Sequence, residues 1–256
     1  MNYSKMLEDK FAVVTCGDTG IGAAIIGLFA EHGATVAFGA KNTETARNLL
    51  AAISKKSPAS FFIPCDLAAA ESIETFCAEI NQRAPLVNIL VNNPWTEFNK
   101  PFDDSNEDDD ELMLQVYQRS IMQTLRAFWT EMLKKEGCSV INISSYSVFK
   151  PVQGMLMRTM ANGAAGGMTR VPAVEGGFRE VRVNEIQVVE EAGICPGFAN
   201  SAHTHANTAG SATNILGGTT DIASSVANTA LYLASEMASY TSGITISVSG
   251  GLRRMR

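Results

Sequence analysis

Short apolar runs rich in β-branched residues alternate along this chain with longer segments whose apolar residues recur at helical spacing. The short runs predict strands at residues 11–15, 35–38, 60–64, 89–91, 139–143, 181–186 and 244–248. The longer segments predict helices at 21–32, 43–54, 69–83, 107–135, 163–176 and 221–235. Strand and helix therefore alternate from one end of the chain to the other.

This alternation predicts the α/β class, because parallel strands need helical crossovers that cover both faces of their sheet. The expected fold is a Rossmann-type, doubly wound sheet of seven parallel strands. No proline-rich linker or internal repeat divides the sequence, so we expect one domain over residues 1–256. The one long irregular segment, 199–218, is rich in small polar residues and predicts a loop.

Composition narrows the classes of partner. The net charge of −6 makes nucleic acid an unsuitable ligand, and the short basic tail Arg253–Arg256 is expected to be solvated. No apolar run has the length of a membrane span, and the mixed charges of residues 1–10 do not fit a signal peptide. We therefore expect a cytoplasmic protein that does not bind membranes.

The cysteines and histidines suggest neither disulfides nor a metal site. The five cysteines are scattered without a CxxC pair, which is typical of reduced thiols in the cytoplasm. His203 and His205 lie in the irregular segment with no third metal ligand nearby in sequence, so we interpret them as loop residues.

A glycine-rich turn follows the first predicted strand and opens the first helix. It reads Thr15-Cys16-Gly17-Asp18-Thr19-Gly20-Ile21-Gly22. Such a turn lets backbone N–H groups approach a pyrophosphate at the positive end of a helix. By itself the signal is weak, but its position after the first strand of a doubly wound pattern strengthens it.

With this turn, which is similar to TGxxxGIG, the chain resembles the classical short-chain dehydrogenase/reductase family over nearly its whole length. Further segments match that family in order along the chain: Cys65-Asp66-Leu67, Leu90-Val91-Asn92-Asn93, Val140-Ile141-Asn142-Ile143-Ser144-Ser145, Gly167-Met168-Thr169-Arg170, Val181-Arg182-Val183-Asn184, Pro196-Gly197 and the closing segment 231–252. The resemblance implies a nicotinamide dinucleotide site built from Cys16, Gly20, Ile21, Gly22, Asp66, Asn92 and Trp95.

That implied cofactor site departs from the family pattern in several places. Cys16 replaces a glycine, and Asp18 brings negative charge to the phosphate turn. After the second strand, Gly39-Ala40-Lys41 offers no carboxylate to a ribose, and Lys41 either favours a 2′-phosphate or is a plain surface lysine. Pro94-Trp95 replaces a small dipeptide, so that Trp95 either fills the ribose space or lies in a surface groove. Residues 185–194 are extra length ahead of Pro196.

The catalytic pattern departs further. The family uses a serine, a tyrosine, a lysine one helical turn later and an asparagine on the long helix. Ser145 is kept. Counting forward from Ser145 and back from Gly167 both place Arg158 at the tyrosine position, which puts Asn162 at the lysine position and Tyr117 at the asparagine position. A guanidinium does not release a proton near neutral pH, so Arg158 cannot replace the tyrosine as acid or base.

A YxxxK sequence at Tyr146–Lys150 is a coincidental match, because it lies in the loop after the fifth strand and not on a helix.

The resemblance also implies surfaces through which members of the family assemble, and the residues expected on these surfaces look intact. One seam would involve the long helix, with Tyr117, Gln118, Met122, Leu125, Phe128, Trp129 and Met132, and the small residues 163–167, although ordinary core packing explains about half of these side chains equally well.

Three hypotheses follow. The first is a catalytically inactive subunit that binds no cofactor itself and pairs with an active, NAD-holding subunit in a heterotetramer; a homo-oligomer is the alternative assembly. This pattern resembles the family's heteromeric dehydrogenases, one of which acts in anaerobic toluene degradation. The second is an active NAD(P)-dependent oxidoreductase with a relocated acid, Tyr117 or Tyr146. The third is a non-redox module in which Arg158 binds an acidic ligand.

Overall fold

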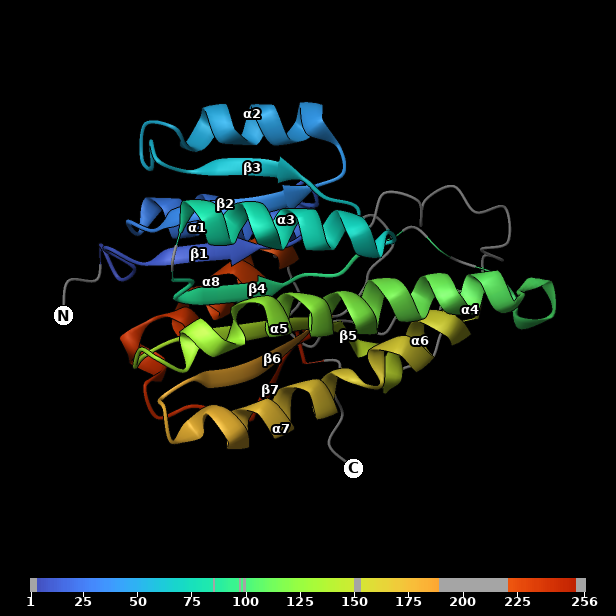
Figure 1. The fold of residues 1–256 in the computed structure, drawn as a ribbon. Helices are drawn as coiled ribbons and strands as arrows, with labels where there is room; N and C mark the ends of the chain where they lie inside the picture. Colours follow the sequence, from blue (N-terminus) through green and yellow to red (C-terminus); the bar gives the residue numbers. More distant parts are fainter. Residues whose placement is uncertain are drawn as a thin grey trace.

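The computed structural model describes residues 4–84, 86–96, 98, 100–149, 153–188 and 221–251. Within them, one parallel sheet of seven strands has the order β3-β2-β1-β4-β5-β6-β7 (Figure 1). The strands are β1 (Phe11–Val14), β2 (Thr35–Ala40), β3 (Phe61–Pro64), β4 (Ile89–Asn92), β5 (Ser139–Ser145), β6 (Arg182–Val188) and β7 (Thr245–Val248). The chain reverses its direction of winding between β3 and β4, and this confirms the doubly wound α/β fold.

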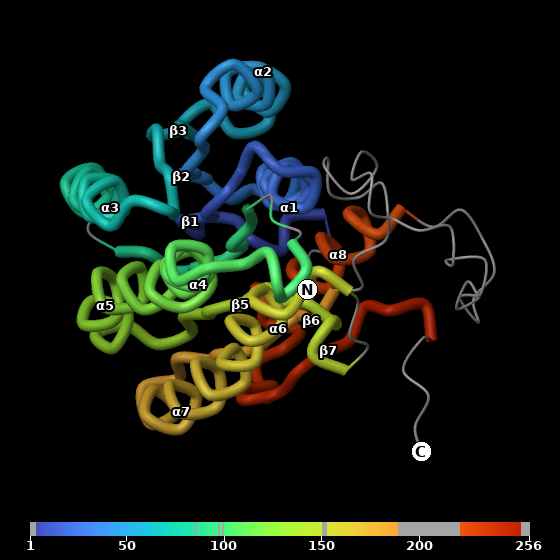
Figure 2. Tube along the Cα trace, turned by 90° about the vertical axis from the view of Figure 1, so that its right-hand side faces the viewer, coloured from blue at the N-terminus to red at the C-terminus, as the bar shows by residue number. Residues whose placement is uncertain are grey.

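Helices cover both faces of the sheet. They are α1 (Gly20–Glu31), α2 (Thr43–Ile53), α3 (Ala70–Arg83), α4 (Glu107–Leu114), α5 (Ser120–Met132), α6 (Leu156–Asn162), α7 (Ala165–Gly177) and α8 (Ile222–Ala234). Figure 2 shows α1 and α8 on one side of the sheet and α3, α5 and α7 on the other. Each face has its own apolar core, one around Phe29 and Phe38 and one around Phe76 and Phe128.

The helix starts follow from short polar residues in the sequence. Thr19 caps α1 by accepting from the Gly22 N–H, and Asn42 caps α2 by accepting from two N–H groups. Asn106 and Asp109 form a capping box at the start of α4. These side chains satisfy backbone donors that have no partner inside the helix. Thr19 follows β1 and Asn42 follows β2, so the two caps also fix the connections between these strands and their helices, where the candidate site lies.

The long helix predicted at 107–135 is interrupted. The α4 helix ends at Leu114, a π-helical turn spans Gln115–Arg119, and α5 begins at Ser120. The turn contains Tyr117, and the Ser120 hydroxyl donates to the Val116 carbonyl across it. A π-helical turn adds a residue to the helix without ending it, so apolar periodicity alone does not reveal it.

The prediction of one helix at 163–176 was incomplete. A separate helix, α6, precedes α7 and contains both Arg158 and Asn162. It ends at Asn162 with Gly163 as its C-cap, and the next helix starts at Ala165. The two family positions therefore lie on a different helix from Thr169, although the two helices are nearly continuous in sequence.

The strand predicted at 181–186 was too short, because β6 continues through Val188 and so includes the first residues of the extra length expected at 185–194. Glu185 and Gln187 interrupt the apolar pattern of this strand, since both residues are polar although they are buried. Hydroxyl groups from the neighbouring strands make that burial possible, with Ser144 and Thr245 donating to the Glu185 carboxylate and Ser247 donating to Gln187.

Several other sequence predictions concern parts of the chain that lie outside the described residues. These are the remainder of the extra segment with Pro196-Gly197, the irregular segment 199–218, Lys150 and the basic tail.

Candidate functional site

The glycine turn after β1 has the backbone geometry that glycine normally supplies, but with a cysteine in it. Cys16 has φ 47°, in the left-handed region, which costs a non-glycine residue about 1–2 kcal/mol. A Cβ on Gly22 would lie 2.3 Å from the Cys16 carbonyl oxygen, so the first turn of α1 packs directly against residue 16. The departure from the family pattern that the sequence shows at Cys16 thus falls on a residue with left-handed backbone geometry.

Asn93 holds this turn against the end of β4. Its side-chain amide donates to the Cys16 carbonyl and to the Thr19 hydroxyl, and its backbone N–H donates to the Thr15 hydroxyl. The neighbouring Asn92, predicted at the cofactor site, instead faces the core. There it donates to Asn142 and accepts from the Thr124 hydroxyl, so its role is to join β4, β5 and α5.

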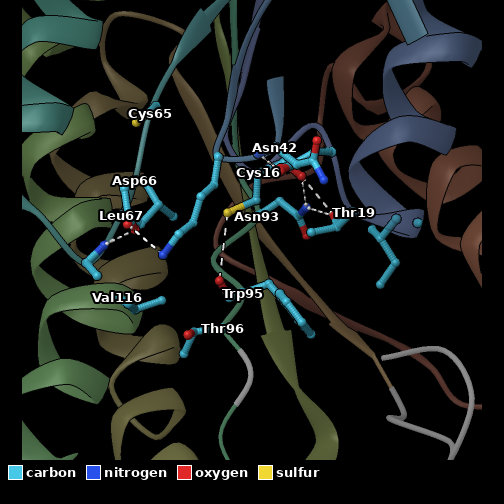
Figure 3. A pocket seen from close by; sticks show the side chains of 15 residues that line it. Cys16, Thr19, Asn42, Cys65, Asp66, Leu67, Asn93, Trp95, Thr96 and Val116 are labelled. Carbon is cyan, nitrogen blue, oxygen red and sulfur yellow. Dashed lines mark hydrogen bonds and ion pairs between the residues drawn. The ribbon is translucent and has the colours of Figure 1, made fainter. Parts of the chain in front are cut away.

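A pocket of about 500 Å³ opens at the carboxyl ends of β1, β2, β3 and β4 (Figure 3). Its lining comes from the turn, the ends of these strands and the π-helical turn: Cys16, Asp18, Thr19, Gly20, Ile21, Lys41, Asn42, Cys65, Asp66, Leu67, Ala68, Asn93, Trp95, Thr96 and Val116. Open sheets of this class bind ligands at this edge, beside the point where the winding reverses. Five of the predicted cofactor positions (Cys16, Gly20, Ile21, Asp66, Trp95) line it, whereas Gly22 and Asn92 do not.

The charged groups of the pocket already have partners among its lining residues. The Lys41 ammonium lies 2.7 Å from Asp66, and the lysine side chain is 73% exposed. Burial acts to raise the pKa of Asp66, but the hydrogen bonds from Lys41 and the Ala68 N–H outweigh it, so the pKa lies below its ordinary value. Asp18 accepts from the Asn42 N–H at 2.6 Å, which ties the turn to the start of α2.

Residues Trp95 and Thr96, which follow β4, are held from both sides. On the pocket side the Cys16 sulfur faces the Trp95 carbonyl oxygen at 3.9 Å (Figure 3). On the opposite side the Thr96 N–H donates to the Tyr117 hydroxyl at 3.3 Å, and Arg158 donates to the Thr96 carbonyl. The Arg158 guanidinium lies 5.8 Å from the centre of the Tyr117 ring. Arg158 and Tyr117 thus fix the wall that Trp95 and Thr96 form.

The four family positions of the catalytic pattern come together but do not line the pocket. Arg158 is 1% exposed, and Ser145, Tyr117 and Asn162 are also buried. Asn162 accepts from the Ser145 N–H at 2.9 Å and donates to the Arg158 carbonyl, so both of these side-chain hydrogen bonds are made to backbone groups. The Ser145 hydroxyl donates to Ser147. These hydrogen bonds link α6 to the end of β5.

Tyr146 lies on a short 3-10 helix, Tyr146–Val148, and packs against Phe149. The YxxxK sequence therefore begins outside α6, as predicted. Among the described residues there is no cluster of three or more potential metal ligands, and no helix with the length and hydropathy of a membrane span.

Four pocket residues were not predicted from the sequence: Asn42, Ala68, Thr96 and Val116. Asn42 carried a detectable signal, because an asparagine between a strand and a helix is a typical N-cap. Thr96 and Val116 carried none, since their positions depend on the irregular segment after β4 and on the π-helical turn.

Groups on α5 and α7 form a second hollow of about 530 Å³, lined by Met122, Leu125, Arg126, Trp129, Thr130, Gly167, Met168, Val171, Pro172 and Glu175. Apolar side chains beside it are unusually exposed, with Val171 at 57%, Val174 at 73% and Phe178 at 97%. We call this surface the α5/α7 face. Of the seam residues predicted on the long helix, Tyr117, Leu125, Phe128 and Met132 are buried, and Met122, Leu125 and Trp129 line the hollow. The remaining one, Gln118, donates to the Ala161 carbonyl.

Known proteins identify the class to which this fold and site belong. The family model described as enoyl-(acyl carrier protein) reductase matches residues 16–253. The glucose and ribitol dehydrogenase homolog of Oryza sativa is 31% identical, covering 96% of this chain and 86% of that protein. The 2,5-dichloro-2,5-cyclohexadiene-1,4-diol dehydrogenase LinX of Sphingobium indicum is 30% identical, covering 96% of both chains.

Among solved structures, a short-chain oxidoreductase from Pseudomonas aeruginosa is similar at 27% identity with a TM-score of 0.84, covering 98% of this chain and 99% of that one, and it is described as containing an atypical catalytic center. The chain belongs to the short-chain dehydrogenase/reductase family, whose named relatives here are oxidoreductases.

Proposed function

We propose that this chain is a catalytically inactive subunit of a heteromeric short-chain dehydrogenase. The main support is Arg158, which stands at the acid/base position, is buried, and donates to the Thr96 carbonyl. A guanidinium stays protonated near neutral pH, so it cannot exchange a proton with a substrate oxygen. Asn162 supplies no positive charge at the neighbouring position, and its amide is engaged with the backbone.

The proposal extends to the cofactor. Of the described residues, those that line the pocket come from β1 to β4 and the π-helical turn, whereas Ser145 and Asn162 are buried behind it. This arrangement does not fit the nicotinamide half of a dinucleotide. The active partner therefore holds NAD and carries out oxidation of a hydroxyacyl substrate, and this chain contributes to assembly.

The α5/α7 face is the proposed partner surface. Exposed apolar side chains beside a hollow are typical of interfaces, and Gly167 lets another helix approach closely because a Cβ there would meet no atom within 4 Å. The specific assembly proposed is the 2-(hydroxy-benzyl)succinyl-CoA dehydrogenase of anaerobic toluene degradation, in which one subunit is inactive and the substrate is a CoA thioester.

Co-expression with a candidate active subunit tests this function. The two chains are expected to co-purify at equal stoichiometry, and the partner is expected to lose turnover when this chain is omitted. If the chains purify separately and the partner is fully active alone, the subunit role is wrong. If this chain assembles only with itself and oxidises substrate, the homo-oligomeric enzyme replaces it.

An active oxidoreductase with a relocated acid is the second candidate. Tyr117 favours it, because its hydroxyl reaches the Thr96 N–H in the wall of the pocket. The similar Pseudomonas aeruginosa oxidoreductase, which is described as containing an atypical catalytic center, also supports this second candidate. Tyr117→Phe and Tyr146→Phe separate the candidates: loss of NAD(P)-dependent turnover in one variant supports this function, and unchanged turnover in both eliminates it.

The third hypothesis, binding of an acidic ligand by Arg158, has less support from the geometry. Its side chain is 1% exposed, and its guanidinium already donates to the Thr96 carbonyl. A thermal-shift screen of carboxylates with the wild-type chain and Arg158→Lys tests the idea, since a shift lost in the variant would restore it.

A further inference from the structure

One side of α7 carries a stripe of exposed residues at a regular spacing. Gly167, Val171, Val174 and Phe178 follow one another at intervals of four, three and four residues. Gly167 is exposed, and the exposed fractions of the three side chains rise along the helix to 97% at Phe178, whereas the opposite side of α7 is buried. The 4-3-4 spacing is that of a seam between two helices that pack side by side. The stripe therefore indicates a surface that another helix covers.

The residues of this stripe increase in size along the helix. It begins at Gly167, where a Cβ would meet no atom within 4 Å, and ends at the aromatic ring of Phe178, with two valines between them. A covering helix must therefore offer a large side chain opposite Gly167 and a small residue opposite Phe178. An antiparallel copy of α7 meets this requirement, because it places Phe178 against Gly167 and Val174 against Val171. The stripe is thus complementary to itself across a two-fold axis.

The hollow of the α5/α7 face lies where the second Phe178 ring would arrive. Both helices lead from the carboxyl edge of the sheet back to the start of the next strand, so they run in the same direction (Figure 1). Trp129 lies at the Gly176 end of α7, because a Cβ on Gly176 would be 2.8 Å from its ring. Met122, about two helical turns earlier on α5, therefore lies at the Gly167 end. Both residues line the hollow, which offers apolar surface beside the glycine.

We propose that two copies of this chain pair through the α5/α7 face, with their α7 helices antiparallel and Phe178 of each copy seated in the hollow beside Gly167 of the other. The inference rests on the proposed use of this face for assembly, and it names what covers the face when the active subunit is absent. The active subunit then enters by taking the place of one copy, so that the homodimer competes with the heteromeric complex.

Light scattering coupled to size-exclusion chromatography of the purified chain is the first test. The wild-type chain is expected to be a dimer at micromolar concentration. Gly167→Leu should raise the dissociation constant of the dimer at least about thirtyfold, because its side chain takes the place of the second Phe178 ring. Gly27→Leu is the matched control, since Gly27 also has open space around its Cβ position but belongs to α1. A monomeric wild-type chain overturns the proposal, as do equal effects of the two changes.

An exchange of side-chain sizes tests the pairing of residue 167 with residue 178. Phe178→Ala alone removes the ring from the hollow and should weaken the dimer. When Phe178→Ala is combined with Gly167→Leu, the leucine of each copy fills the space that the ring of the other copy has left. The combined variant should therefore dimerise at least about tenfold more tightly than Gly167→Leu alone. Absence of this recovery in a folded variant contradicts the pairing.

Disulfide trapping measures the direction of the two helices. Gly167 and Phe178 lie roughly 16 Å apart along α7, so in an antiparallel pair each residue is far from its own counterpart and close to the other residue. A mixture of Gly167→Cys and Phe178→Cys chains, oxidised with copper–phenanthroline, is expected to form a covalent dimer, whereas each variant alone should not. Linkage within a single variant, or none in the mixture, overturns the antiparallel arrangement.

The outcomes for this inference and for the proposed function can be told apart. A chain that is monomeric alone but assembles with the active subunit and supports its turnover overturns only the inference. A homodimer with the expected disulfide pattern that no active subunit can enter supports the inference and contradicts the proposed function.

Discussion

Arg158 shows how a residue at a former catalytic position can become part of the structure. Its guanidinium joins α6 to the segment after β4 and lies beside the Tyr117 ring in the π-helical turn. A buried cation is tolerated only where polar or aromatic groups replace its water, and here a carbonyl and a ring contribute. The side chain is therefore expected to stabilise the fold at the place where an enzyme of this class would keep an ionisable tyrosine.

Replacing Arg158 by alanine should cost roughly 3 kcal/mol of unfolding free energy. The change leaves a cavity and deprives the partly buried Thr96 carbonyl of a donor. Urea denaturation measures the loss. Arg179→Ala removes a guanidinium from an exposed residue and should change stability by less than about 0.5 kcal/mol. Equal effects of the two changes would contradict the structural role of Arg158.

The buried thiols give the protein a predictable response to alkali. Burial raises the pKa of Cys65 and of Cys77 to about 12, with the neighbouring thiol adding to the effect at Cys65. A raised thiol pKa means that the folded state keeps protons that the unfolded state loses, so this stability is present below about pH 9 and declines as the pH rises toward 12.

Between about pH 8 and pH 10, each of these thiols should therefore remove roughly 1 kcal/mol of unfolding free energy. Denaturation curves at the two pH values measure the total decline. In a Cys65→Ala, Cys77→Ala double variant the decline should be correspondingly smaller, and a decline of the same size in both proteins would rule out the thiols as its source.

At the scale of elements, the packing of α7 against α5 depends on one glycine. A Cβ on Gly176 would lie 2.8 Å from the Trp129 ring and 3.0 Å from the Val181 Cβ, whereas a Cβ on the adjacent Gly177 would meet no atom within 4 Å. Both residues belong to the last turn of α7. Substitutions at Gly176 and Gly177 therefore distinguish the effect of tight helix packing from the effect of intrinsic helix propensity.

Gly176→Ala is expected to destabilise the protein by about 1–3 kcal/mol, because Trp129 or the backbone at Val181 must move. Gly177→Ala should be neutral or stabilise it by roughly 0.5 kcal/mol, because alanine favours the helix and meets no obstacle. Chemical denaturation of both variants measures these effects, and a Gly177→Ala loss as large as that of Gly176→Ala would contradict the packing argument.

Most elements could be predicted from the sequence, and the exceptions have physical causes. Strands such as 89–92 are continuous apolar runs, which is typical of a parallel sheet buried on both faces. The end of β6 escaped prediction because hydroxyls on β5 and β7 satisfy the polar groups of Glu185 and Gln187, and such pairing is visible only after folding.

The candidate site was predictable in part for similar reasons. Glycine spacing located Cys16 and the turn, because backbone geometry is local. The contacts that define the wall at Thr96 join residues far apart in sequence, and no local pattern indicates that Arg158 and Tyr117 converge there.

At the scale of the whole molecule, the two hollows lined by described residues lie on different elements. The pocket of about 500 Å³ lies at the ends of β1 to β4, and the second hollow lies on the outer surface of α5 and α7. Residues that stabilise the first are buried, whereas those that form the α5/α7 face are partly or largely exposed. Changes at the face can therefore alter assembly without disturbing the fold or the pocket.

A charge on the α5/α7 face should prevent assembly. Val174→Glu is expected to abolish the complex with the partner while leaving the unfolding free energy of the isolated chain within about 0.5 kcal/mol, since the side chain is 73% exposed. Light scattering coupled to size-exclusion chromatography measures the complex. Phe102→Glu places a charge at an equally exposed position outside the face, and loss of assembly in this variant too would argue against a specific interface.

The edge position of β7 has a consequence for hydrogen exchange. All four residues of this strand are partly exposed, and within the described chain it pairs only with β6, whereas β5 is buried throughout and paired on both sides. Amide protons of β5 should exchange with deuterium only when the whole molecule unfolds, and those of β7 through local opening of the edge. A ligand or partner that covers the β7 edge should therefore slow deuterium uptake by β7. The uptake by β5, measured in the same experiment, serves as the internal reference.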